Sequence, residues 1–317
     1  MSKKKRRPGD GTKLEGAGAK IPNRELHHWW PKGLSKYWAD QDGLVSQLRY
    51  CGKLHRSTPK TFGAMTNAHA IKLKGPWNST IEPMFNFPDT NLPRIVGGIL
   101  EALSVAYSAD GNRAHGDRAI RPYAISGEDQ DALSEGLASL VIRSPGYREF
   151  IRLNTNHYRE RFGLPGIDGR DNLIAGQIHQ WYSTAVASFQ SANVVFLYSK
   201  AQEFIFGEGY LNNFQGTSYT FNLRAVVPLA PELAVICFSG SGRTPPSRCC
   251  SLCATPEDVA AINELSQVYT KEFVYFRSQQ PTTLEVFSRN EFLQREYHRD
   301  AVVEGIIQAV REARVSR

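Results

Sequence analysis

The sequence has no long hydrophobic run. Nowhere in its 317 residues does it approach roughly 20 consecutive apolar residues, the length that a membrane-spanning helix needs. The basic run Lys3–Arg7 is followed by Pro8 and Gly9, where a secretory signal would carry its apolar segment. We therefore predict a cytoplasmic protein without a membrane partner.

Cysteine is scarce, and its five copies are an odd number. An odd count argues against a disulfide framework and favours a reducing compartment. Cys51 and Cys237 lie in apolar segments and are expected in the core. Cys249, Cys250 and Cys253 form one Cys-x-x-Cys cluster, but a structural zinc site needs four ligands and no second pair is present. The pattern favours an ordinary loop over a metal or redox site.

The body of the chain lacks a charge of one sign. The net charge is +7, yet residues 1–24 hold eight Lys or Arg and two acids, which leaves 30 basic and 29 acidic residues for the rest. A Gly- and Lys-rich tail buries too little apolar surface to fold, so we predict that residues 1–20 are disordered. Such a tail could bind nucleic acid through phosphate contacts, or could simply keep the protein soluble.

Hydrophobic periodicity divides the remaining chain into a hairpin, a helical middle and a C-terminal half rich in strands. An Asp-Gly turn opens the hairpin predicted over residues 43–58. Helices are predicted from apolar spacing and capping residues over residues 92–108, 126–143, 145–163, 173–189, 255–277 and 284–314. Strands are predicted over residues 69–73, 194–198, 204–206, 219–227 and 233–238, with a loop over residues 239–254.

This order of elements predicts an α+β fold. The expected sheet, mixed or antiparallel, is built from the N-terminal hairpin and the strands of the C-terminal half, and packs on a central helical layer. Because its strands come from both ends of the chain, residues 21–317 are expected to form a single domain behind the disordered tail.

Several segments resemble a known bacterial family. The run His27-His28-Trp29-Trp30-Pro31, with Leu34 after it, resembles the opening of the family called domain of unknown function 4238. Further similar segments follow in the same order: Asp42-Gly43, Pro59–Asn67, Ile81-Glu82, Leu140–Phe150, Val227–Pro231 and Ile262–Tyr275. The resemblance covers about residues 21–278. Where the family typically carries Thr-Ser-Asp-x-Pro, this chain has Glu208 in place of the aspartate and lacks the proline. The resemblance implies no particular reaction, because the family's chemistry is not established.

The adjacent histidines His27 and His28 are the strongest local signal for chemistry. A neutral imidazole can ligate a metal or act as a general base near neutral pH, so both are candidate catalytic residues. With His55 they would suggest a His-Asn-His endonuclease, but the middle asparagine of that architecture is missing. The alternative is that one of them is a buried, hydrogen-bonded structural group among the neighbouring tryptophans.

Glu82 and Glu208 are the carboxylates predicted to hold a divalent metal. Two carboxylates with one or two histidines can hold Mg²⁺ or Mn²⁺ and position a water for phosphodiester attack, so Glu208 is also a candidate catalytic residue. Glu208 lies between two glycines, where the backbone can approach a ligand closely. The alternatives are a Gly-Glu-Gly hairpin turn and, for Glu82, a charge that stabilises a helix N-terminus.

Arg143, Arg148 and Asn263 are the predicted substrate-binding residues. The two arginines flank Pro145 at a junction between helices, where a guanidinium can clamp a phosphate or a carboxylate. The alternative is that they bind the carbonyls left free at the end of the preceding helix. Asn263 could instead tie loops together.

These residues support two functional hypotheses. The first is a metal-assisted phosphodiester hydrolase that acts on nucleic acid or another phosphate substrate. The second is a non-catalytic module that binds nucleic acid or protein, for instance in a bacterial defence or stress system. An enzyme predicts that His27 or His28 meets Glu82 and Glu208 in one cleft. The substrate, the metal and the oligomeric state stay open.

Overall fold

The computed structural model describes residues 25–72, 79–108, 120–168, 172–212, 223–239, 248–292 and 301–315. The tail predicted to be disordered lies outside these described residues. Within the described ranges, no helix combines the length and the apolar character that crossing a membrane requires.

The larger sheet has five strands in the order β10-β11-β8-β12-β7. Its strands are β7 Arg121–Pro122, β8 Asn193–Tyr198, β10 Arg224–Ala230, β11 Leu233–Phe238 and β12 Cys249–Cys253. The sheet is mixed, because β8 pairs antiparallel with β11 and parallel with β12. Almost every residue of β8, β10 and β11 is buried, as expected for strands covered on both faces. Pro228 lies at an irregularity of β10, which is an edge strand and therefore tolerates proline.

The smaller sheet joins segments from both ends of the chain, in the order β3-β2-β13-β9. Its strands are β2 Val45–Arg49, β3 Leu54–Ser57, β9 Phe206–Gly207 and β13 Phe273–Phe276. The predicted hairpin, β2 and β3, thus pairs through β2 with β13 from the C-terminal half. Two short strand pairs complete the N-terminal region, β1 Leu26–His28 with β4 Ala64–Thr66, and β5 Ala70–Ile71 with β6 Ser79–Thr80.

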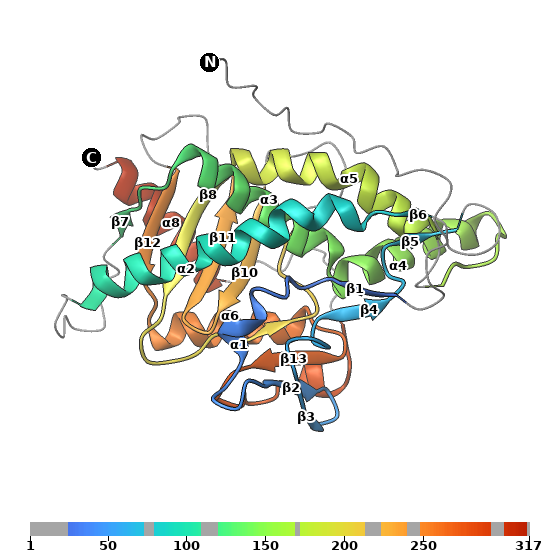
Figure 1. Ribbon diagram of the computed structural model, residues 1–317, viewed down its shortest axis with the longest axis horizontal. Helices are drawn as coiled ribbons and strands as arrows, with labels where there is room; N and C mark the ends of the chain where they lie inside the picture. The colour runs from blue at the N-terminus through green and yellow to red at the C-terminus, as the bar shows by residue number, and fades with distance from the viewer. Residues whose placement is uncertain are drawn as a thin grey trace, which may run out of the picture.

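The helices, together with the two sheets, confirm the α+β class. They are α1 Ser35–Trp38, the 3-10 helix η1 Glu82–Phe85, α2 Asn86–Ser108, α3 Gly127–Arg143, α4 Pro145–Arg161, α5 Asn172–Ser191, α6 Pro256–Val268, α7 Glu285–Ser288 and α8 Ala301–Val315. Helix α3 packs against both α2 and α5. Figure 1 shows α2 crossing in front of the larger sheet, α8 partly hidden behind it, and the smaller sheet below. The predicted caps are confirmed, since the side chains of Ser126 and Thr255 accept N–H bonds from Asp129 and Asp258.

Three predicted elements differ in the structure. The helix predicted over residues 255–277 ends at Val268, and its last part forms β13. That segment pairs with β2 on one side and β9 on the other, so sheet pairing overrides the local pattern. The loop predicted over residues 239–254 contains β12, which makes the cysteine cluster part of a largely buried strand. The helix predicted over residues 284–314 is represented by α7 and α8.

Candidate functional site

Three side chains from separate segments form what we call the histidine–glutamate cluster: His27, His69 and Glu82. Each offers one ligand atom, and these atoms lie within 4.8 Å of one another. In the part of the chain that the structure describes, this is the one group of three or more His, Cys, Asp or Glu residues close enough to share a metal ion.

Strand β1 places His27 in the interior. Leu26 is exposed, His27 is buried and His28 is half-buried, as the alternation of a strand requires. The strand is held by β4 and by Asn67, whose backbone adopts a left-handed conformation with φ of 56°. The Asn67 side chain accepts the backbone N–H of Glu25, and the backbone N–H of Asn67 donates to the Glu25 carbonyl. These two bonds fix the chain just before His27.

The β5–β6 pair then brings Glu82 to His69. The carbonyl of His69 accepts the backbone N–H of Ile81 at 2.9 Å and the hydroxyl of Thr80 at 3.1 Å. The backbone N–H of Glu82 in turn donates to the Thr80 hydroxyl. Glu82 therefore starts η1 directly beside His69, which agrees with the alternative that Glu82 lies at a helix N-terminus.

His69 is completely buried, and its two ring nitrogens differ. Nδ1 is hydrogen-bonded to the Glu82 carboxylate, whereas Nε2 is buried without a hydrogen-bond partner. Burial holds the pKa of His69 well below its ordinary value, and the charges of Arg148 and Arg143 lower it further. The ring is therefore neutral at pH 7, and a proton on Nδ1 facing Glu82 leaves a lone pair on Nε2. Burial also raises the pKa of Glu82, although His27 and Arg143 oppose that effect.

Two buried arginines adjoin the cluster. Arg143, at the end of α3, binds both carboxylate oxygens of Asp89 in α2 and donates to the carbonyl of His28. Its guanidinium lies 4.9 Å above the ring of Phe85, which itself lies 5.0 Å from the ring of His69. Arg148, in the first turns of α4, is buried, and burial lowers its pKa to about 10. The pair supplies positive charge next to a neutral histidine.

Glu208 lies outside the cluster and binds backbone. Its Oε2 accepts the N–H groups of Glu272 and Phe273, at 2.9 and 3.2 Å, where β13 begins. A Cβ on Gly209 would collide with the carbonyl oxygen of Tyr269 after α6. The close backbone approach that the glycines permit is therefore to another segment of the same chain. Burial raises the pKa of Glu208 to about 7 despite the two N–H bonds.

The other predicted residues have separate positions. The Nε2 of the half-buried His28 ring lies 3.4 Å from the carbonyl oxygen of Lys60, and the His28 backbone is hydrogen-bonded to the Glu82 carboxylate. Asn263 accepts the N–H of Ile205 at 2.8 Å and donates to the carbonyl of Glu203 at 2.9 Å. Asn263 therefore ties the β8–β9 connection to α6, which is the alternative that the sequence left open.

Sequence reasoning missed His69 and Asp89. His69 follows no recognisable motif, and only the β5–β6 pairing places it against a residue 13 positions later in the chain. Asp89 precedes the helix predicted from residue 92, whereas in the structure it lies in the first turn of α2. Long-range contacts, which a single sequence does not display, give both residues their significance.

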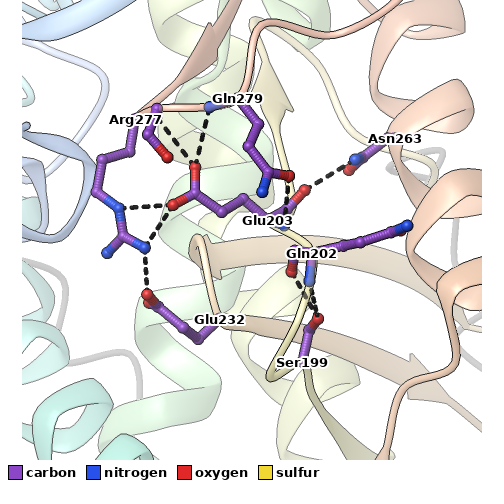
Figure 2. A network of polar contacts seen from close by, with 8 residues as sticks. Ser199, Gln202, Glu203, Glu232, Asn263, Arg277 and Gln279 are labelled. Atoms are coloured by element: carbon purple, nitrogen blue, oxygen red, sulfur yellow. Dashed lines mark hydrogen bonds and ion pairs between the residues drawn. The ribbon is translucent and has the colours of Figure 1, made fainter.

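A second polar network surrounds Glu203 (Figure 2). Its Oε1 accepts the Nε and Nη2 groups of Arg277, at 2.9 and 2.5 Å, and its Oε2 accepts the N–H of Ser278 at 3.0 Å. Arg277 also binds Glu232. The network borders an open depression of about 820 Å³, where Arg56 binds Asp40 and Asp42.

No protein-family model matches this chain, and no curated protein or solved structure was found to be similar to it. The family resemblance noted in the sequence therefore stays a prediction. The fold and the site define an α+β protein with a buried histidine–glutamate cluster, and the functional argument depends on that geometry.

Proposed function

We propose that this chain is a metal-assisted hydrolase of phosphate esters, with its centre at the histidine–glutamate cluster. The observation that carries the proposal is the buried Nε2 of His69, which has no hydrogen-bond partner while Nδ1 is fixed by Glu82. A carboxylate that orients a histidine in this way is the usual support of a metal-binding imidazole. Nε2 of His27, in the same cluster, is likewise buried without a hydrogen-bond partner.

The donor set favours a particular kind of metal. An imidazole ligand suits Mn²⁺ or Zn²⁺, whereas Mg²⁺ prefers oxygen ligands and keeps most of its water. Such a metal supplies a Lewis acid and an activated water for attack on phosphorus. The side chain of Glu82 is 31% exposed and that of His69 is 0% exposed, so approach to the cluster is over Glu82.

The neighbouring residues suit a phosphate substrate. Arg148 and Arg143 place positive charge beside the cluster, and both act on His69. Arg143 is bound to Asp89, so its part is to hold the site's shape, and the buried charge of Arg148 adds to the positive potential at His69. His28 is the proposed base because it is half-buried and its backbone is hydrogen-bonded to the Glu82 carboxylate. Nucleic acid is one such substrate, and the basic N-terminal residues would favour it.

Hydrolysis of bis(p-nitrophenyl) phosphate with and without Mn²⁺ tests the proposal. We expect Mn²⁺-dependent turnover that falls at least about 100-fold in His69→Ala and Glu82→Gln, since general-base or metal contributions are of this size. His55→Ala is the matched control, because His55 lies on β3, outside the cluster, with its ring against that of Phe273 in β13. Equal rates in all four proteins would contradict the proposal and favour the non-catalytic binding module.

A further inference from the structure

Strand β3 forms an open edge of the smaller sheet. It pairs with β2 on one side, and no strand of the described chain pairs with it on the other. Figure 1 shows β3 at the lower end of the molecule. An edge of this kind presents backbone N–H and C=O groups that can pair with another strand. We propose that the β3 edge and the depression beside it bind an extended peptide of a partner protein, one that presents apolar and basic side chains on the same face.

This surface is separate from the histidine–glutamate cluster. No residue of the cluster lines the depression. The inference therefore goes beyond the proposed hydrolase, and either one can fail without the other.

The hydrogen bonds of the hairpin show which backbone groups of β3 face outward. The backbone N–H of Arg49 donates to the carbonyl of Lys53 at 3.0 Å, where the turn between β2 and β3 closes. Bonded and non-bonded pairs alternate along an antiparallel ladder. Following the register of the two strands, the N–H and C=O groups of His55 point to β2, whereas those of Leu54 and Arg56 point away from it. The outward groups thus belong to two residues on the same face of the sheet.

The side chains of the same two residues line the open depression of about 820 Å³. Leu54 is 48% exposed although it is apolar, and the side chain of Arg56 is 41% exposed. Directly opposed residues of neighbouring strands have their side chains on the same face of a sheet. A peptide strand added to β3 would therefore place every second side chain over the depression. Strand addition obtains its affinity from the backbone bonds and its specificity from such alternate side chains.

The charges around the depression favour a basic peptide. Three acids against two bases give its lining a net charge of −1: Asp40, Asp42 and Glu203 against Arg56 and Arg277. Arg56 is bound to both Asp40 and Asp42, which neutralises the charge that would otherwise protect this edge from an added strand. The side chain of Asp42 is 70% exposed and can bind a lysine of the peptide, beside an apolar side chain over Leu54.

Fluorescence anisotropy with a labelled peptide of repeated Val-Thr-Lys-Thr units tests the proposal on the full chain. Leu54→Pro removes an outward N–H, a change that edge strands tolerate, whereas Leu54→Thr retains it. We expect Leu54→Pro to bind the peptide at least about tenfold more weakly than Leu54→Thr, since the lost N–H bond also leaves an acceptor of the peptide unpaired. Thermal unfolding checks that both variants are folded. Equal binding by the two folded variants would overturn the inference.

Two N-methylated forms of the same peptide test the backbone pairing directly. One form is methylated at its Val and Lys residues and the other at its Thr residues. Only every second N–H of an added strand faces its neighbour, so we expect one form to lose binding and the other to retain it. Equal binding of the two forms, or no binding of the parent peptide by the unmodified protein, would contradict strand addition.

Asp42→Asn keeps the proposal testable if Leu54→Pro does not fold. The pair between Asp42 and Arg56 is exposed, so the variant retains its fold, and we expect about threefold weaker peptide binding at low salt. Unchanged binding at low salt would contradict the predicted basic contact. Light scattering of the peptide-free protein tests the other occupant: a dimer that Leu54→Pro disrupts would assign the edge to a second copy of the chain and overturn the inference.

Discussion

Glu82 and Glu203 are both partly buried carboxylates beside arginines, yet their surroundings differ. Although burial opposes ionisation of Glu203, hydrogen bonds from Arg277 and Ser278 hold its pKa below the ordinary value. Burial raises the pKa of Glu82, whose side chain is nonetheless the more exposed, 31% against 11%. The two residues show that exposure alone does not decide in which direction the pKa of a carboxyl group shifts, because the hydrogen-bond donors that reach it also count.

The difference separates a structural network from a candidate site. Around Glu203 the carboxylate is bound by Arg277 and by backbone N–H groups (Figure 2), so the network joins strands and connections. Around Glu82 a carboxylate in an unfavourable environment orients a histidine whose other nitrogen has no partner. Desolvated titratable groups of this kind are typical of functional sites.

The arginines extend the comparison and give the largest expected effect. Arg143 is completely buried and has Asp89 as its carboxylate partner. Arg277 is 29% exposed and has two carboxylate partners, Glu203 and Glu232. Asp89→Asn leaves a buried guanidinium without a counter-charge, and we expect unfolding in urea to show a loss of about 3 to 5 kcal/mol. Asp42→Asn, in the exposed pair with Arg56, is the control and should leave the midpoint unchanged. A small effect at Asp89 would mean that the Arg143 pair is not structural.

Substitution of the two glutamates by glutamine tests the comparison itself. Glu203→Gln turns an acceptor into a donor that faces Arg277 or backbone N–H groups, and should cost about 1 to 3 kcal/mol at pH 7. Because the pKa of Glu203 is lowered from 4.5, the ionised group stabilises the fold above that value and the cost should shrink as the solution becomes more acidic. Glu82→Gln should leave stability unchanged or higher at pH 7 while it abolishes Mn²⁺ binding. A loss of stability in Glu82→Gln equal to that in Glu203→Gln would contradict the distinction between a structural network around Glu203 and a candidate site around Glu82.

Substitution of Glu208 gives the smallest expected change in stability, and that change depends on pH in the opposite sense. Its pKa is raised from 4.5 to about 7, so the folded state binds the proton more tightly than the unfolded state does. Its contribution to stability is therefore complete below pH 4.5 and is lost as the pH rises through 7. Glu208→Gln should equal the unmodified protein at pH 4 and exceed it by about 1 to 2 kcal/mol at pH 8. Parallel stability curves from pH 4 to 8 would contradict this account.

Local chemistry made part of this structure predictable. The Asp42-Gly43 turn, the cap at Ser126 and the proline at the start of α4 act over a few residues, and the elements they mark are present. Strand β13 was missed because its pairing with β2 joins residues more than 200 positions apart. For the same reason, only part of the candidate site could be predicted from the sequence. His27 and Glu82 are in motifs, whereas His69 gains its role only from contacts made on folding.

Calorimetric titration with Mn²⁺ of the unmodified protein and of His69→Ala tests the central claim most directly. The account predicts one Mn²⁺ per chain for the unmodified protein, weaker binding of Mg²⁺, and no Mn²⁺ binding by a folded His69→Ala variant. Absence of binding by the unmodified protein, or equal binding by the variant, would contradict the assignment of the histidine–glutamate cluster as a metal centre.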